Sequence, residues 1–134
     1  QRKIFVFARE NLPKLGYKRR IELMNPIIRG LVGEKMSASI PGSKIDVLDN
    51  EETVNKKIRN AEAVAGDPNN GIMQFIRYII FPIKRDKKQK LIIKRDKKHG
   101  GDITYSNYKQ LEKDYVSKKI HPLDVKNTLT KETL

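Results

Sequence analysis

The chain contains no cysteine, which excludes a disulfide framework and a thiolate zinc site. It also lacks long apolar runs: no stretch reaches the roughly 18 residues that a membrane span needs, and no signal-peptide pattern opens it. With 37% hydrophobic and 34% charged residues among 134, the composition is not that of a disordered tail. We therefore expect one globular domain or two small pieces, without a membrane segment, in the cytoplasm.

Acidic residues are scarce relative to basic ones. The chain carries 29 Lys and Arg against 16 Asp and Glu, which gives a formal net charge of +13. The basic residues cluster at 18–20, 84–98 and 118–119, a distribution that favours a polyanionic partner, most often nucleic acid. A solubility margin or a Lys-rich proteome would produce the same excess.

The first 28 residues combine a helical pattern with a strand-like one. Four apolar residues recur at helical spacing: Ile4, Phe7, Ala8 and Leu12. They predict a helix that ends at Pro13 and Gly16. Because no initiator Met or capping residue precedes this helix, we expect the chain to continue a longer protein. Residues 20–28, apolar at 21, 23 and 24, predict a buried strand that ends at Asn25-Pro26.

The segment from Gly30 to Ser43 contains three Gly, one Pro and three Ser, and predicts a long mobile loop of the kind that contacts ligands. From Lys44 onward the patterns become helical. A helix is predicted over residues 51–64, capped by Asp49 or Asn50, with an apolar stripe at 54, 58 and 61. A loop follows at 66–71, and the apolar run 72–83 predicts a buried helix that Pro82 ends.

The remaining residues predict a hairpin and two helices. Residues 91–93 and 102–105 flank a turn at 99–101 and predict a short β-hairpin or a pair of extended arms. A helix is expected from Ser106, ended at His121-Pro122, and a last helix over 123–134 with Pro122 in its first turn. We expect four inward side chains on the first of these helices: Tyr108, Leu111, Tyr115 and Val116. The tyrosines at 105, 108 and 115 fit core packing better than base stacking.

The string Gly33 to Ser39, Gly-Glu-Lys-Met-Ser-Ala-Ser, resembles the KMSKS loop of class I aminoacyl-tRNA synthetases. Residues 24–39, followed by Ser-Lys-Ile-Asp at 43–46, resemble the archaeal and eukaryotic tyrosyl branch of that family. Taken alone, K-M-S-x-S also fits an ordinary polar surface loop. In the family, the loop closes on the negative charge that develops as pyrophosphate leaves ATP.

The resemblance implies an ATP site on this loop. Lys35 would contact the leaving phosphates, Ser37 and Ser39 would supply hydroxyl and backbone donors, and Met36 would lie between them in the ATP-binding stretch. Gly30 and Gly33 would be hinges. Ala38 stands where the family motif has its second Lys, so one cation of the motif is absent.

The resemblance also implies contacts with adenine and with tyrosine. Adenine would be bound largely by backbone between Ile27 and Leu31. Gln1, at the start of a Gln-Arg-Lys segment, would hold the amino-acid end of the tyrosine substrate, although it fits a polar helix N-terminus equally. Mg²⁺ would accompany ATP, and we expect no tightly bound cofactor and no metal ligand in this chain.

Residues 121–127, His-Pro-Leu-Asp-Val-Lys-Asn, resemble the HPxDxK signature of the same tyrosyl branch. Asp124 would accept from the Watson–Crick edge of guanine, the first anticodon base. His121 and Pro122 would hold the segment and offer packing surface, and Lys126 would engage a neighbouring base or phosphate. Without the family, Pro122 fits a first-turn proline and Asp124 an acid favoured by the helix dipole.

Lys98-His99-Gly100-Gly101 matches a segment in which the family has a base-stacking aromatic residue before the glycines. Here that residue is His99, which also fits a surface turn. The neighbouring basic run would meet the RNA backbone, with some lysines facing only water: Lys84, Arg85, Lys87, Lys88, Lys90, Lys94 and Arg95.

Together these motifs imply an α/β remnant, the C-terminal end of a Rossmann-like catalytic domain at residues 1–45, and a mainly α anticodon-binding domain with a short hairpin at 46–134. The parent protein would be a tyrosine–tRNA ligase, acting on tyrosine, ATP and tRNA-Tyr as a homodimer. We expect the 134 residues alone to be inactive, because the HIGH-type motif lies upstream in the family. A stand-alone RNA-binding module and the tryptophanyl relative are the alternatives.

Overall fold

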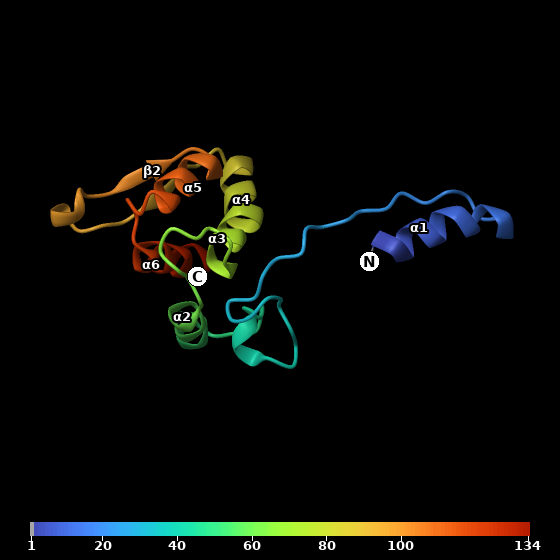
Figure 1. Ribbon diagram of the computed structural model, residues 1–134, viewed down its shortest axis with the longest axis horizontal. Helices are drawn as coiled ribbons and strands as arrows, with labels where there is room; N and C mark the ends of the chain where they lie inside the picture. The colour runs from blue at the N-terminus through green and yellow to red at the C-terminus, as the bar shows by residue number, and fades with distance from the viewer. Residues whose placement is uncertain (1) are drawn as a thin grey trace.

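The computed structural model describes residues 2–134 and shows an N-terminal arm, residues 2–28, that reaches away from a helical body, residues 29–134 (Figure 1). Helix α1 (Arg2–Asn11) opens the arm and is followed by a short 3₁₀ helix, η1 (Pro13–Leu15). Gly16 ends the turn with a φ of 84°, in the left-handed region. The predicted helix and its ending are confirmed. Gln1, the predicted tyrosine contact, lies outside the described residues.

The predicted buried strand at residues 20–28 is wrong. The segment is extended but forms no strand, and Ile21, Leu23 and Ile27 are 93%, 85% and 85% exposed. A strand needs a neighbour to pair its backbone groups. Within residues 2–134 the only sheet is a hairpin elsewhere in the chain, so the apolar residues of this segment have no layer to pack on.

Residues 30–43 form an irregular loop, as predicted, which we call the signature loop. Its two ends meet: the N–H of Leu31 donates to the carbonyl of Ser43 at 2.8 Å, and both residues are fully buried. A short 3₁₀ helix, η2 (Pro41–Ser43), closes it. The loop is therefore anchored to the body at its base.

Helix α2 (Glu51–Asn60) begins where the sequence predicts. The Asn50 side chain caps it by accepting from the N–H of Thr53 at 2.9 Å, and the apolar stripe at 54, 58 and 61 is buried. The helix ends at Asn60 rather than at 64, because Ala61 turns to an extended conformation (φ −59°, ψ 144°). The predicted end is thus four residues too late.

The apolar run after the 66–70 loop is one continuous helical rod with a wide turn in its middle. It consists of α3 (Gly71–Phe75), a π-helical segment, η3 (Ile76–Ile80), and α4 (Phe81–Asp86). The prediction that Pro82 ends the helix is wrong. The N–H of Phe81 reaches back to the carbonyl of Ile76, so the turn before Pro82 is wide enough for the proline ring and the helix continues.

The predicted hairpin is confirmed. Strand β1 (Leu91–Ile93) pairs antiparallel with β2 (Ile103–Tyr105), with Leu91 opposite Tyr105. A 3₁₀ turn, η4 (Lys97–His99), lies at the tip and is followed by two glycines with positive φ, 92° at 100 and 71° at 101. Only glycine adopts such a pair of conformations without strain.

Two helices complete the body, α5 (Tyr108–Val116) and α6 (Pro122–Thr133). Leu111 and Tyr115 are buried as predicted, but Val116 is 50% exposed because it lies at the end of α5, off the buried face. All buried hydrophobic residues belong to the body: Leu31, Val54, Ile58, Ala61, Ile72, Met73, Ile76, Ile80, Leu91, Ile93, Tyr105, Leu111, Tyr115, Ile120, Val125 and Leu129. Among residues 2–134, no helix has the length and apolarity to cross a membrane.

Candidate functional site

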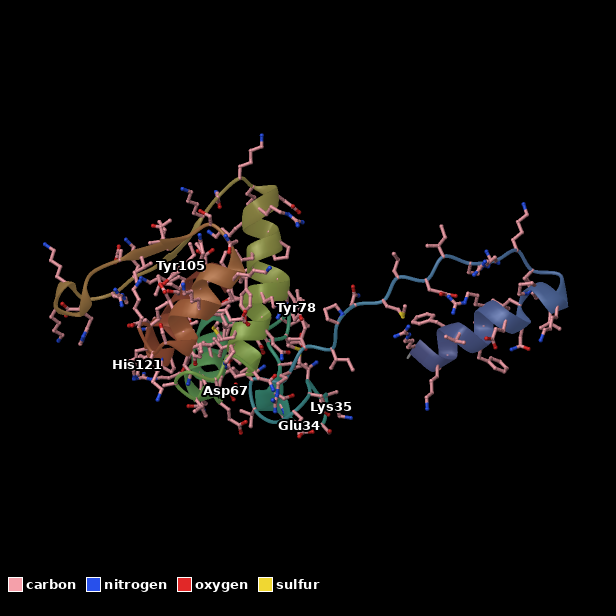
Figure 2. All side chains as sticks on the ribbon, turned by 45° about the horizontal axis from the view of Figure 1, so that its top comes forward. Glu34, Lys35, Asp67, Tyr78, Tyr105 and His121 are labelled. Atoms are coloured by element: carbon pink, nitrogen blue, oxygen red, sulfur yellow. The ribbon has the colours of Figure 1, made fainter. Side chains whose placement is uncertain are left out.

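The signature loop holds Ser37 by two hydrogen bonds and leaves the Lys35 side chain without a partner among residues 2–134. The buried Ser43 hydroxyl donates to the carbonyl of Ser37 at 3.0 Å and accepts from its N–H at 2.9 Å. The hydroxyls of Ser37 and Ser39 lie 2.8 Å apart. Lys35 is exposed and has no hydrogen-bond or ion-pair partner among residues 2–134, and Figure 2 shows it at the surface beside Glu34. Its ammonium group is available to an external anion.

Two glycines shape the loop for different reasons. At Gly33 the backbone has a φ of 76°, and its N–H donates to the carboxylate of Glu62 at 3.3 Å. At Gly30 a Cβ would lie 2.5 Å from the carbonyl oxygen of Val32, so close backbone approach requires glycine there. Gly30 is thus part of a packed turn.

The predicted contact between Leu31 and adenine stays a prediction, although the backbone of Leu31 is occupied within the body. Leu31 is fully buried, its N–H donates to Ser43, and its carbonyl accepts from the N–H of Glu62 at 2.7 Å. All of its polar backbone groups are therefore used inside the body. Ile27, at the other end of the predicted adenine stretch, is 85% exposed and stays a prediction.

The second candidate site lies at the start of α6. His121 caps the helix: its Nδ1 accepts from the N–H of Leu123 at 3.2 Å, and Pro122 is buried. Asp124 is half-buried in the first turn, and its carboxylate has no hydrogen-bond or ion-pair partner in the part of the chain that the structure describes. In a chain of net charge +13, a carboxylate without a partner is notable, since it can accept from an external donor.

Arg95 joins the hairpin tip to the segment that precedes His121. Its Nε donates to the carbonyl of Gly101 at 2.9 Å, and its Nη1 donates to the carbonyl of Lys119 at 2.9 Å. The exposed His99 lies in the turn just before Gly100 and Gly101. Arg95 thus links the two predicted parts of the RNA site, the hairpin tip and the segment before α6. The sequence did not predict this role, because no local pattern indicates it.

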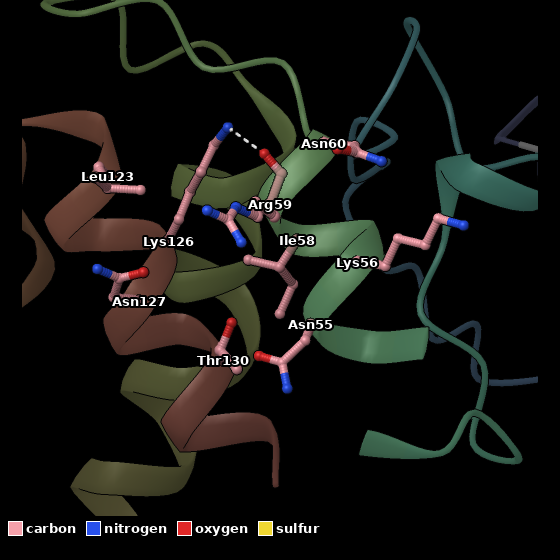
Figure 3. Close-up of a pocket in the computed structure, with 9 residues that line it drawn as sticks. All are labelled: Asn55, Lys56, Ile58, Arg59, Asn60, Leu123, Lys126, Asn127 and Thr130. Carbon is pink, nitrogen blue, oxygen red and sulfur yellow. Dashed lines mark hydrogen bonds between the residues drawn. The ribbon is translucent and has the colours of Figure 1, made fainter. Parts of the chain in front are cut away.

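The ammonium group of Lys126 has acceptors within the body, and its predicted contact with RNA stays a prediction. Its Nζ donates to the carbonyl of Arg59 at 3.0 Å (Figure 3) and to that of Ala61 at 2.6 Å. Burial lowers the pKa of Lys126. A groove of about 510 Å³ opens beside it between α2 and α6. The groove has no carboxylate in its lining: Asn55, Lys56, Ile58, Arg59, Asn60, Leu123, Lys126, Asn127 and Thr130.

The basic run 84–95 divides into paired and unpaired residues. Lys84 contacts Glu132 at 2.7 Å, Arg85 contacts Asp86, Lys94 contacts Asp102 at 2.6 Å, and Arg95 serves as described. Lys87, Lys88 and Lys90 are exposed, without a partner among residues 2–134. Figure 2 shows Lys35 and His121 on different sides of the body, so the two candidate sites are separate.

The signature loop presents Lys and Ser residues and is followed by a basic helical body, an arrangement that fits the sequence resemblance to class I aminoacyl-tRNA synthetases. Residues 1–134 match the family of class I tRNA synthetases for tryptophan and tyrosine, and the chain belongs to this family.

Similar proteins narrow the comparison to tyrosyl enzymes. The chain is 48% identical over 130 residues to the cytoplasmic tyrosine–tRNA ligase of Gallus gallus, a match that covers 96% of this chain and 24% of that protein. It is 46% identical to the cytoplasmic enzyme of Saccharomyces cerevisiae, over 94% of this chain and 34% of that protein. The tyrosyl-tRNA synthetase of Archaeoglobus fulgidus, solved with L-tyrosine, superposes with a TM-score of 0.88 at 42% identity, over 99% of this chain and 40% of that one. The chain thus spans well under half the length of these relatives.

Proposed function

We propose that the protein to which this chain belongs is a tyrosine–tRNA ligase. The tyrosine carboxylate attacks the α-phosphorus of ATP, the bond to pyrophosphate breaks, and tyrosyl-adenylate forms. A hydroxyl of the terminal ribose of tRNA-Tyr then attacks the tyrosyl carbonyl, and AMP leaves. The observation that carries the proposal is the match of the whole chain to tyrosyl enzymes, with the loop and α6 motifs in their order.

In this proposal the signature loop acts on the leaving pyrophosphate. Lys35 has no partner among residues 2–134, and Ser37 is fixed by the buried Ser43. A preorganised loop with a free cation stabilises charge that develops in the transition state. Met36 and Ser39 would complete the phosphate contacts, and Ile27 would lie at the adenine. Gln1 is proposed to hold tyrosine.

The start of α6 and the hairpin tip would read the anticodon. Asp124 would accept from guanine N1–H and N2–H, His99 would stack on the base, and His121 and Pro122 would hold the helix start. The unpaired lysines of the basic run would meet the RNA backbone. Support for this comes from the unpartnered Asp124 carboxylate and from the Arg95 contacts that hold both elements together.

We further propose that residues 1–45 belong to the nucleotide-binding domain and that 46–134 form the anticodon-binding domain. In this proposal Mg²⁺ accompanies ATP. Relatives named cytoplasmic support a cytoplasmic location. That the enzyme is a homodimer is proposed from the family resemblance alone.

Binding of tRNA-Tyr with guanine or adenine as its first anticodon base tests the RNA site. The unaltered chain should prefer guanine, and Asp124→Ala should lower that preference by about tenfold or more, the value of a hydrogen bond to a charged group. Asp86→Ala removes an equal charge from an exposed position on α4 and is the matched control. Equal affinity of the unaltered chain for both RNAs would remove Asp124 from this role.

Tyrosine-dependent exchange of pyrophosphate into ATP tests the enzyme. The protein that carries this chain should catalyse it, and Lys35→Ala should lower kcat by roughly 10²–10³, as loss of an oxyanion-stabilising donor does. The 134 residues alone should show no exchange. RNA binding without exchange by the parent protein would favour a stand-alone RNA-binding module instead.

A further inference from the structure

Lys126 connects two helices that are distant in sequence. It lies on α6, and its Nζ donates to the carbonyl of Arg59, 67 residues away in the sequence (Figure 3). It also donates to the carbonyl of Ala61, 65 residues away. Arg59 lies in the last turn of α2, where backbone carbonyls have no partner within the helix, and Ala61 is the residue that follows the helix as its C-cap. A cation is favoured at this end of the helix dipole. Lys126 therefore caps α2 from another helix.

The peptide group that Lys126 holds is also the anchor of the signature loop. The carbonyl of Ala61 and the N–H of Glu62 belong to one planar peptide unit. While the carbonyl accepts from Lys126 at 2.6 Å, the N–H donates to the carbonyl of Leu31 at 2.7 Å. Hydrogen bonds arranged in such a chain polarise and strengthen one another. The loop base and α6 thus contact opposite sides of a single rigid group.

From Leu31 the path continues to the serines of the loop. The N–H of Leu31 donates to the carbonyl of Ser43 at 2.8 Å, and the Ser43 hydroxyl exchanges two hydrogen bonds with the backbone of Ser37. Leu31 and Ser43 are both fully buried, so this path is packed within the body. The path ends at Ser37, two residues from Lys35. It begins at Lys126, two residues from Asp124 on α6.

We infer that Lys126 is a positioning residue for amino-acid activation: by fixing the Ala61–Glu62 peptide, it holds the base of the signature loop at a set place relative to the helix that carries Asp124. This rests on the proposed function, since it assigns activation to the loop. A further consequence is that RNA bound at the start of α6 and the position of the loop depend on one another.

Partial burial of Lys126 is consistent with this role. Desolvation lowers the pKa of Lys126, and its two hydrogen bonds replace lost water contacts. Lys131, on the same helix, is exposed and has no ion-pair partner among residues 2–134. Lys126 and Lys131 can therefore be compared as two lysines of one helix, of which only Lys126 donates hydrogen bonds to α2 and its C-cap.

Amide hydrogen exchange on the 134-residue chain tests the link without any RNA or substrate. Lys126→Met should speed exchange at the amides of Leu31, Ser37 and Glu62 by about tenfold or more, because a charge-assisted hydrogen bond that anchors them is lost. Exchange at the buried Leu129 amide should change little, and Lys126→Arg should restore most of the protection. Lys131→Met should leave all of these amides unchanged. Equal acceleration throughout the body, or no change at the loop base, would overturn the inference.

A kinetic measurement in the complete synthetase separates positioning from general stability. Lys126→Met should lower kcat for pyrophosphate exchange about tenfold at temperatures where the variant is fully folded, with the KM for tyrosine unchanged, since a displaced loop acts on the transition state. Lys126→Arg should recover the rate. An unchanged kcat would overturn the inference. Absence of exchange in the unaltered protein would refute the proposed function, and the amide measurement would still decide the link.

Discussion

The N-terminal arm and the helical body carry similar apolar patterns but differ in what those residues touch. In the arm, α1 has no buried residue, and Ile21 and Leu23 are 93% and 85% exposed. In the body, residues of the same types at 58, 111 and 129 are at most 1% exposed. An apolar side chain is therefore buried only where another element packs against it. The elements of the body pack against one another, whereas those of the arm leave these side chains exposed.

The two secondary-structure types of the arm respond differently to this lack of a partner. Helix α1 forms although it is exposed, because a helix pairs its own backbone groups. Residues 20–28 remain without a strand, because a strand pairs its backbone groups only with a neighbour. An apolar strand pattern thus predicts a strand only where a neighbour is present.

A leucine series measures the difference between arm and body directly. Leu129→Ala should lower the free energy of unfolding by about 2–5 kcal/mol, the usual loss for a buried leucine. Leu123→Ala, on the same helix but 49% exposed, should lower it less, and Leu23→Ala, 85% exposed, should change it least. Urea unfolding followed by far-ultraviolet circular dichroism gives the three values. A loss at 23 equal to that at 129 would contradict the comparison.

Most of the body could be predicted from the sequence because its signals are local. Asn50 and Pro122 mark helix starts, and the Gly100-Gly101 pair marks the hairpin turn. The errors arose where a distant contact or a wider hydrogen-bonding pattern decides. Helix α2 ends early because the backbone of Ala61 is extended rather than helical. The helical rod of residues 71–86 continues past Pro82 because a π-helical turn precedes it, which residue propensities do not predict.

For the candidate sites, motif order indicated which segments matter but not what each side chain does. Asp124 and Lys35 are unpartnered within residues 2–134, in keeping with their predicted roles. Lys126 belongs to the same motif as Asp124, yet its Nζ caps α2. A lysine that binds phosphate and one that caps a helix have the same letter and the same spacing, so only the fold distinguishes them.

Gly71→Ala tests the junction between the signature loop and the body. A Cβ at 71 would lie 2.1 Å from the carbonyl oxygen of Gly30, a backbone atom that cannot rotate away. We expect a loss of about 1–3 kcal/mol in the free energy of unfolding, typical of overpacking. Gly42→Ala is the control, because a Cβ there meets nothing within 4 Å. If both variants unfold at the same urea concentration, the loop does not pack on α3 as described.

Acid should weaken the body through carboxylates that are paired there. A hydrogen bond from Lys94 and another from the Arg95 N–H hold the pKa of Asp102 below its usual range, and Lys57 does the same for the pKa of Asp49. Because these pKa values are lower in the folded than in the unfolded chain, their stabilisation is complete above about pH 4 and is lost as the pH falls further.

The measurement is the urea midpoint between pH 7 and pH 3. It should fall only below about pH 4. Asp102→Asn should begin with a lower midpoint at pH 7, and its difference from the unaltered chain should shrink as the pH falls toward 3, since the stabilisation by the carboxylate is lost as the carboxylate becomes protonated. A constant difference between the two chains across this range would show that the ion pair with Lys94 contributes no pH-dependent stability.

The smallest expected effect belongs to the arm itself. Ile21→Ser combined with Leu23→Ser should change the free energy of unfolding by no more than about 0.5 kcal/mol, the usual range for exposed positions, because both side chains already face water. Ile58→Ser, at 1% exposure, is the matched control and should destabilise the body strongly. The double variant should also reduce concentration-dependent association seen by light scattering, since contiguous exposed apolar residues promote it. A loss above about 1 kcal/mol, greater than exposed sites give, would mean that residues 20–28 pack on the body in solution. Arm and body would then differ only in how much apolar surface each buries.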